Sequence, residues 1–213
     1  MGRPARLSRD AICEAAMDLL RTSGAADFTL RSLGRQLGVD PTAVYRHFAD
    51  KDDLLLEVGD RSMAPVTRGF RSSDDCLGDI TRLCRKLRKT LIENPVVLPI
   101  VAAGPTRREN ELRITEIVLD ALGRAGLPVK ERVIAYHAII EYTLGSAWLD
   151  APLSAAEADR ADTYRRWRED YRHLDAGDFP ATVSAAKDLY PSSNAVFEAG
   201  LEALLTGLTR AAQ

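Results

Sequence analysis

The chain has 213 residues, of which 46% are apolar and 28% charged, the composition of a water-soluble globular protein of one or two domains. This composition excludes a disordered chain, and no run approaches the about 18 uninterrupted apolar residues that a membrane-spanning helix needs. The net charge of −2 is uneven, because residues 1–51 hold eight basic and six acidic side chains and the remainder carries −4. A mildly basic N-terminal part weakly favours a polyanionic partner.

Helices are predicted along the whole chain, because apolar residues recur at helical spacing and no segment alternates as a strand does. The first helix should cover Arg9 to Thr22, with Ser8 as its N-cap. A second, short helix should begin after Thr29 and end at Gly38. No apolar run follows the basic residues 1–6, so we expect a cytoplasmic protein without a secretory leader or a membrane partner.

The third predicted helix runs from Pro41 to Phe48. Asp40 is its N-cap, and the proline occupies the first helical position, where a missing N–H costs nothing. Val44 and Phe48 lie four residues apart and form its buried pair. Asp50 should begin a fourth helix.

Beyond residue 65 the predicted helices are longer, and each break between them contains proline or glycine. Residues 175–192 are less regular and should form a loop with one short helical piece. The longer helices are expected over Asp74–Glu93, Thr106–Ala125, Lys130–Asp150, Ala155–Leu174 and Ser193–Ala211.

The two short helices joined by Gly38-Val39-Asp40 form a candidate helix-turn-helix. A helix of this size fits the major groove of DNA, which is about 12 Å wide. Two ordinary surface helices are the alternative. Base edges are candidate partners for Thr42 and Arg46, and phosphates for Thr29, Tyr45, His47 and Lys51, whereas Arg3 and Arg6 form an arm suited to the adjacent minor groove.

Four motifs follow one another in this region: Phe28-Thr29-Leu30-Arg31-Ser32-Leu33-Gly34, Leu37-Gly38-Val39, Tyr45-Arg46-His47-Phe48, and Lys51 with Leu54 and Leu55. In this combination, residues 8–56 resemble the DNA-binding domain of the TetR (tetracycline-repressor) family of transcription regulators. The resemblance implies an all-α protein with a three-helix DNA-binding domain in residues 1–50. Residues 51–213 would then form a helical domain for ligand binding and dimerisation.

Matching positions also imply which residues contact the operator. The resemblance assigns operator contacts to Thr42, Ala43, Tyr45 and His47, and a phosphate contact to Lys51. Together with the candidates above, the predicted DNA-binding set is Arg3, Arg6, Thr29, Arg31, Thr42, Ala43, Tyr45, Arg46, His47 and Lys51.

Two motifs near the C-terminus, Tyr142-Thr143-Leu144-Gly145 and residues 197–202 followed by Gly207-Leu208, resemble the effector domain of the tetracycline repressors that give the family its name. In the last helix, small residues recur every four positions, which lets two helices approach closely. We therefore expect a homodimer with a four-helix interface; the alternative is that both helices line one subunit's core. The predicted interface residues are Val133, Ile140, Leu144, Ala199, Gly200, Ala203, Leu204 and Gly207.

The resemblance also implies a small-molecule effector, which stays unidentified. Residues 95–104, which correspond to the metal-binding helix of the tetracycline repressors, contain no His, Asp or Glu, so a ligand other than a metal-bound tetracycline is expected. Three cysteines and three histidines offer little for a zinc site, and neither a metal nor a cofactor is predicted. The candidate lining is Leu98, Ile100, Leu119, Leu122, Tyr142 and Trp148, with His137 and Glu141 as polar anchors.

The sequence thus predicts a homodimeric repressor that binds a palindromic operator and is released by its ligand, and not an enzyme. Two alternatives stay open. One is a helical adaptor that does not bind DNA. The other is a small helical enzyme that uses His137 with Glu141 as a general base pair, although no nucleophile or cofactor motif accompanies them. A satisfied core or interface pair is the plainer interpretation of these two residues.

Overall fold

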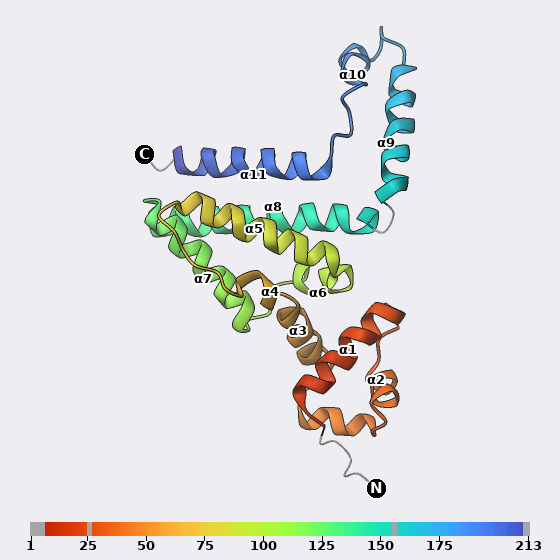
Figure 1. Ribbon diagram of the computed structural model, residues 1–213, viewed down its shortest axis with the longest axis vertical. Helices are drawn as coiled ribbons and strands as arrows, with labels where there is room; N and C mark the ends of the chain where they lie inside the picture. The colour runs from red at the N-terminus through yellow and green to blue at the C-terminus, as the bar shows by residue number, and fades with distance from the viewer. Residues whose placement is uncertain (1–6, 25–26, 155–156, 211–213) are drawn as a thin grey trace.

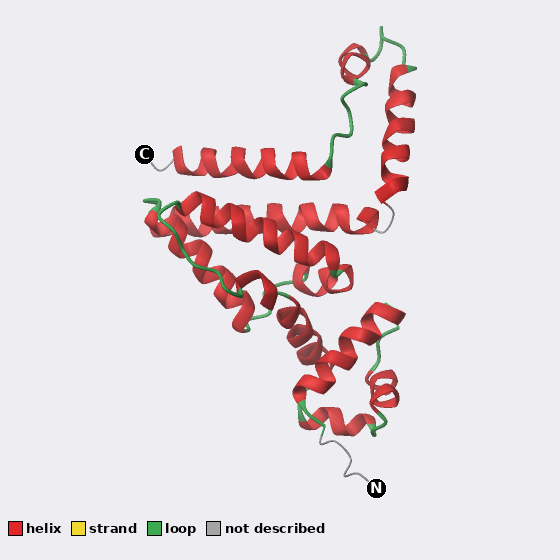
Figure 2. Cartoon of the chain, viewed as in Figure 1, coloured by secondary structure: helices red, strands yellow, loops and turns green. Residues whose placement is uncertain are grey.

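The computed structural model describes residues 7–24, 27–154 and 157–210, and every regular element in these ranges is a helix (Figure 1; Figure 2). The all-α prediction is confirmed. Arg3, Arg6, Ala155 and Ala211, which carry sequence predictions, lie outside the described ranges. The helices are α1 (Arg9–Ser23), α2 (Leu30–Leu37), η1 (Pro41–Arg46), α3 (Lys51–Ser62), α4 (Ala64–Thr67), α5 (Cys76–Glu93), η2 (Pro95–Val97), α6 (Leu98–Ala102), α7 (Glu109–Arg124), α8 (Val129–Ser154), α9 (Glu157–Arg172), α10 (Pro180–Ala185) and α11 (Ser193–Arg210).

The N-terminal helices α1, α2 and η1 form a small head at one end of the molecule (Figure 1). Their apolar faces meet in one cluster, which Leu54 and Val58 of α3 complete. The other side of α3 contacts α6 and α7, so this helix links the head to the rest of the chain. The cluster's fully buried side chains include Ile12, Leu20, Phe28, Leu33 and Val44.

The second cluster forms the body, in which α5 packs on α8 and both contact α7 and α11. Leu83, Leu122, Ile139 and Phe197 are among its fully buried members. A buried ion pair between Arg88 of α5 and Asp150 of α8 lies at its edge. Arg88 also donates to Ser146 (2.9 Å) and Asn194 (2.7 Å), so one guanidinium joins α5, α8 and α11.

Helices α9 and α10 project away from the α8–α11 layer (Figure 1). Aromatic rings hold the segment together, since Trp167 and Tyr190 have ring centroids 4.9 Å apart and Tyr164 packs beside both. The predicted loop with one short helical piece is confirmed by α10. No helix among the described residues has the length and apolarity that crossing a bilayer would require.

Two predicted helix boundaries in the body are wrong. Helix α7 begins at Glu109 and not at Thr106, because the Thr106 side chain bonds to α3 and Arg107 takes a left-handed φ of 56°. Helix α8 continues past Pro152 to Ser154, where a break was expected. Proline in a last turn removes only one N–H from a ladder that is already ending.

Candidate functional site

The turn between α2 and η1 has the geometry that the sequence predicts. At the start of α2, the Thr29 hydroxyl accepts from the Ser32 N–H (3.0 Å), and the Ser32 hydroxyl accepts from the Thr29 N–H (3.1 Å). The helix ends at Gly38, whose φ of 66° and ψ of 28° lie in the left-handed region. The N–H of Val39 then bonds to the Gly34 carbonyl (3.0 Å) and fixes the direction in which η1 leaves.

The next helix is a 3-10 helix that ends at Arg46, whereas the sequence predicts a helix as far as Phe48. The Asp40 carboxylate accepts from both the Thr42 N–H (2.8 Å) and the Thr42 hydroxyl (2.6 Å), and these bonds lower the pKa of Asp40. The Asp40 carbonyl accepts from the N–H of Ala43, three residues on, which is the tighter 3-10 pattern. The side-chain cap therefore fixes the start of this short helix, and the backbone bond shows its 3-10 pitch.

One side of η1 is anchored and the other is open to solvent. Val44 is fully buried and Phe48 is 2% exposed, whereas Tyr45 is 55% exposed. Arg46 and Arg31 are also exposed, and Ala43 and His47 are half-buried. The side chains of Arg31, Tyr45 and Arg46 make no hydrogen bond or ion pair with any other described residue. A polar surface with unengaged cationic side chains is suited to a polyanion.

Two basic residues contact the backbone and aromatic rings of segments next to this surface. The Lys51 ammonium donates to the Phe28 carbonyl (2.8 Å) and lies 5.5 Å from the centre of the Phe28 ring. The Arg9 guanidinium donates to the His47 carbonyl (2.5 Å) and lies 4.2 Å from the centre of the Phe48 ring. Sequence reasoning missed Arg9; its one signal was a cation in the first turn of a helix, where the helix dipole disfavours positive charge.

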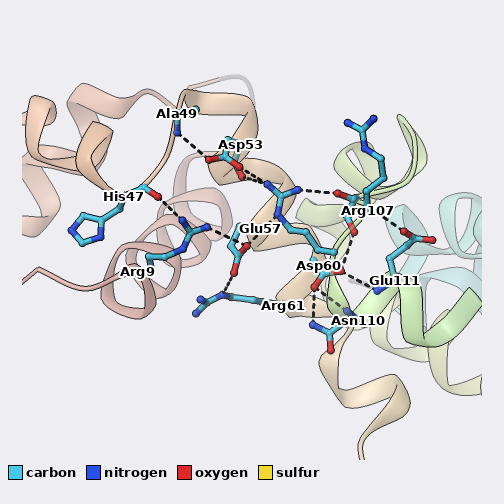
Figure 3. Close-up of polar contacts among 12 residues, drawn as sticks. Arg9, His47, Ala49, Asp53, Glu57, Asp60, Arg61, Arg107, Asn110 and Glu111 are labelled. Carbon is cyan, nitrogen blue, oxygen red and sulfur yellow. Dashed lines mark hydrogen bonds and ion pairs between the residues drawn. The ribbon is translucent and has the colours of Figure 1, made fainter. Parts of the chain in front are cut away.

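A chain of ion pairs leads from Arg9 to the body (Figure 3). Arg9 lies 3.5 Å from Glu57 of α3, and Glu57 accepts from Arg108 (3.1 Å), just before α7. Arg108 also pairs with the Asp53 carboxylate, and it donates to the Asp53 carbonyl (3.0 Å) and to the Thr106 carbonyl (2.9 Å). One arginine thus joins α3 to the loop that precedes α7.

Asp60, which is 4% exposed, makes a second joint between the same elements (Figure 3). Its carboxylate accepts from the Thr106 hydroxyl (2.9 Å), the Glu111 N–H (2.9 Å) and both the backbone N–H (3.1 Å) and side-chain amide (2.8 Å) of Asn110. Buried carboxylates are stable only when hydrogen bonds replace their lost water. We call the residues of these two joints the α3–α7 clamp: Asp53, Glu57, Asp60, Thr106, Arg108, Asn110 and Glu111.

Behind the clamp lies a cavity of about 370 Å³. Helices α5, α6, α7 and α8 contribute to its walls, and two members of the clamp, Thr106 and Glu111, belong to its lining. Within the described residues, no group of three His, Cys, Asp or Glu side chains is placed to hold a metal ion. The walls of the cavity are mostly apolar and include Met63, Leu87, Val101, Ile114, Ile140 and Leu144.

The cavity includes His137 and Glu141 of the predicted ligand set, and the other six lie elsewhere. Leu98 and Leu122 are buried in the body, and Leu119 is half-buried on α7. Ile100 packs against Gly59 and the head cluster. The Tyr142 hydroxyl donates toward the Val196 carbonyl (3.1 Å) on α11, and Trp148 is 48% exposed. Cavity residues that the sequence did not indicate include Glu111, Thr115 and Tyr136.

The predicted interface residues divide into two groups. Exposed positions are Val133 on α8 and Ala199, Ala203 and Gly207 on α11. The others face inward: Ile140 and Leu144 line the cavity, Leu204 is half-buried, and a Cβ at Gly200 would lie 2.0 Å from the Tyr142 hydroxyl. The outer face of α8 instead presents Ile134 (61% exposed) and Leu149 (74% exposed), two residues that the sequence analysis did not select.

Two family models match the chain and together cover most of it. Residues 12–58 match "Bacterial regulatory proteins, tetR family", and residues 72–212 match "Tetracyclin repressor-like, C-terminal domain". The first match includes the helix-turn-helix and most of α3, and the second includes the cavity wall formed by α5 to α8.

Individual relatives agree with these matches. An HTH-type transcriptional regulator of Saccharopolyspora erythraea is 29% identical and covers 82% of this chain and 76% of its own. The class C tetracycline repressor protein of Escherichia coli is 28% identical, over 96% of this chain and 92% of its own. A TetR transcriptional regulator of Streptomyces coelicolor has a solved structure with a TM-score of 0.83 and 26% identity, over 98% of this chain and all of its own. The chain therefore belongs to the TetR family of bacterial transcriptional regulators.

Proposed function

We propose that this regulator represses transcription as a homodimer that binds a palindromic operator and is released when a small molecule fills the cavity. The single observation that carries this proposal is the surface of η1. Val44 and Phe48 hold it to the head, while Tyr45 and Arg46 stay exposed. Residues projected from an anchored short helix can reach base edges in the major groove.

Exposed apolar residues on α8 and α11 support a dimer. Ile134, Leu149 and Val196 are each more than half exposed, and a monomer rarely leaves such a surface bare. Gly145 of α8 and Gly207 of α11 have open space where a Cβ would lie, so a second pair of helices can approach closely there. An isologous dimer of this kind would place two η1 helices about 34–36 Å apart, one turn of DNA.

Ligand release is supported by the contacts that the cavity shares with the clamp. Thr106 and Glu111 line the cavity and also bond to Asp60 of α3, the helix that completes the head. A ligand that binds one arrangement of these residues more tightly shifts the population toward it. If the heads of that arrangement no longer match successive grooves, operator affinity falls.

The enzyme alternative has less support. His137 and Glu141 lie 3.9 Å apart with side chains 63% and 78% exposed, so water screens the pair. Their position at the cavity fits a ligand contact better than a general base. Turnover that survives loss of Tyr45 and Lys51 but not of His137 would favour the enzyme.

The test begins with selection of bound sequences from a random DNA pool by the full-length protein. We expect a palindrome with half-sites about one helical turn apart, and binding that weakens steeply with salt because phosphate contacts release counterions. Failure to enrich any palindrome would favour an adaptor that does not bind DNA.

Variants then separate contacts to phosphates from contacts to bases. Tyr45→Ala and Lys51→Ala should lower affinity for all sequences alike, by about tenfold, whereas Thr42→Ala and Arg46→Ala should change which base is preferred. Arg71→Ala, which removes an exposed charge from the loop before α5, is the matched control. Equal losses on every sequence for the Thr42 and Arg46 variants would contradict the base-reading assignment.

A further inference from the structure

The charged residues of the cavity have one sign. Among the described residues, its lining contains two carboxylates, Glu111 on α7 and Glu141 on α8, and neither lysine nor arginine. The remaining walls are mostly apolar, so a charge inside is poorly solvated. An apolar space bordered by carboxylates favours cations and disfavours anions.

Glu111 has no cationic partner among the described residues. One of its oxygens accepts from the Thr115 hydroxyl (2.7 Å), and the other accepts from the backbone N–H of Arg107 (3.2 Å). Arg108, three positions earlier, instead donates to Asp53 and Glu57 on α3. The carboxylate is therefore held in place by neutral donors while its charge stays unpaired.

An aromatic ring lies beside this carboxylate. Tyr136 lines the cavity, is half-buried, and its hydroxyl lies 2.8 Å from the Thr115 hydroxyl, which in turn contacts Glu111. The ring of His137 meets the ring of Tyr136 edge-on, with centroids 5.2 Å apart. A carboxylate and an aromatic ring that line the same apolar cavity are the combination that binds ammonium and quaternary ammonium groups.

We propose that the effector is a hydrophobic organic cation, an aromatic or alkyl amine or quaternary ammonium compound. Its positive group lies beside Glu111 and Tyr136, with Glu141 as a second carboxylate of the lining, and its apolar body packs against Leu87, Ile114 and Leu144. This inference rests on the proposed ligand-responsive function and specifies the chemistry of the ligand. The backbone N–H of Glu111 donates to Asp60. The residue that would contact the positive group of the ligand therefore also belongs to the α3–α7 clamp.

Calorimetric titration of the full-length protein at pH 7.5 with three naphthyl probes tests the proposal. The probes carry a trimethylammonium, an acetyl or a sulfonate group on the same ring system. We expect the cation to bind at least about tenfold more tightly than the neutral probe, and the anion not to bind. A neutral or anionic probe that binds as well as the cation would overturn the proposal.

Charge-neutral variants locate the site. Glu111→Gln should weaken cation binding by about tenfold, and Glu141→Gln, whose side chain is 78% exposed, should weaken it by less; both should leave binding of the neutral probe unchanged. Glu116→Gln removes an exposed carboxylate from the same helix as Glu111, outside the cavity lining, and should have no effect. Equal affinity of all three variants for the cation would contradict the assignment.

The outcome is separable from that of the DNA experiment. A wild-type protein that selects a palindrome but does not bind the cation would refute the ligand class and leave the repressor in place. A protein that binds the cation through Glu111 but selects no DNA sequence would support the ligand class and refute the repressor. The melting temperature of each variant, compared with that of the wild type, shows whether a loss of binding is due to a loss of folding.

Discussion

At the scale of single residues, Arg9 holds the end of η1 in place. Its guanidinium donates to the His47 carbonyl and stacks on Phe48, the residue that anchors this segment in the head. The contact is partly exposed, so its contribution to the free energy of unfolding is small, about 1 kcal/mol. Its larger effect should be on the orientation of Tyr45 and Arg46.

We expect Arg9→Met to lower operator affinity by about tenfold on all sequences, because methionine covers Phe48 but cannot hold the His47 carbonyl. Gel-shift titration measures this, with Arg71→Met as a control for the lost charge. Arg9→Lys distinguishes positioning from simple attraction to phosphate. If lysine restores full affinity, the planar contact with His47 and Phe48 is unimportant.

Residues such as Arg9 and Glu111 could not be selected from the sequence, because their partners lie far along the chain. His47 is 38 positions from Arg9, and Asp60 is 51 positions from Glu111. Sequence patterns report neighbours within a helix turn. The candidate DNA surface was predictable because one short segment, residues 38–48, contains both its turn and its exposed residues.

At the scale of elements, a buried carboxylate holds the start of α5 to the loop before it. Burial opposes ionisation of Asp79, but hydrogen bonds from the Ser73 backbone and hydroxyl, together with ion pairs to Arg124 and Arg82, lower its pKa to about 2. Arg124 of α7 also donates to the Ser73 carbonyl (2.7 Å). The Arg124–Asp79 pair thus joins α7 to the same loop.

Asp79→Asn should therefore destabilise the protein at neutral pH by about 2 kcal/mol. A carboxylate whose pKa is lowered by folding stabilises the protein above its unfolded pKa of 3.8, and the effect disappears as pH falls toward 2. Urea unfolding of both proteins at pH 7, 4 and 2.5 should show the difference shrinking between the last two values. A difference independent of pH would contradict an ionised Asp79.

Most helix starts in the head could be read from the sequence, because each depends on one local side chain. Ser8 and Asp40 cap the helices that they were predicted to cap, and Thr29 and Asp50 cap the two helices that were predicted to begin at or just after them. The start of α7 could not be read this way, since Thr106 bonds to Asp60 on another helix. Local signals thus predict where a helix begins, unless the side chain that would cap the helix is hydrogen-bonded to a residue far along the chain.

At the scale of the whole molecule, α3 belongs to both halves. Leu54 and Val58 pack in the head, while Asp53, Glu57 and Asp60 bond to the segment before α7. The domain boundary predicted between residues 50 and 51 stays a prediction, and the contacts of α3 argue that the two halves unfold together. The clamp is one connection between the cavity and the head, and the contact of α3 with α6 is another.

Arg108 offers the sharpest test of this coupling. Its side chain is 20% exposed and its partners Asp53 and Glu57 are 31% and 18% exposed, so removing it leaves the Asp53 carboxylate without its arginine and leaves Glu57 with Arg9 and Arg61 alone among the described residues. We expect Arg108→Met to weaken the contact between head and body by about 2 kcal/mol. Amides of α1 and α3 should then exchange with solvent faster while those of α8 keep the wild-type rate, as native-state hydrogen exchange can measure.

Arg113→Met is the matched control, because Arg113 also lies on the α7 side but, within the part of the chain that the structure describes, pairs only with the exposed Glu109 on its own helix. Such a pair contributes less than about 0.5 kcal/mol, so exchange in both halves should stay at the wild-type rate. If Arg108→Met speeds exchange equally in α1 and α8, the clamp stabilises the fold as a whole. If it changes neither, α3 transmits through its apolar contacts alone, and the ion pairs do not couple the cavity to the head.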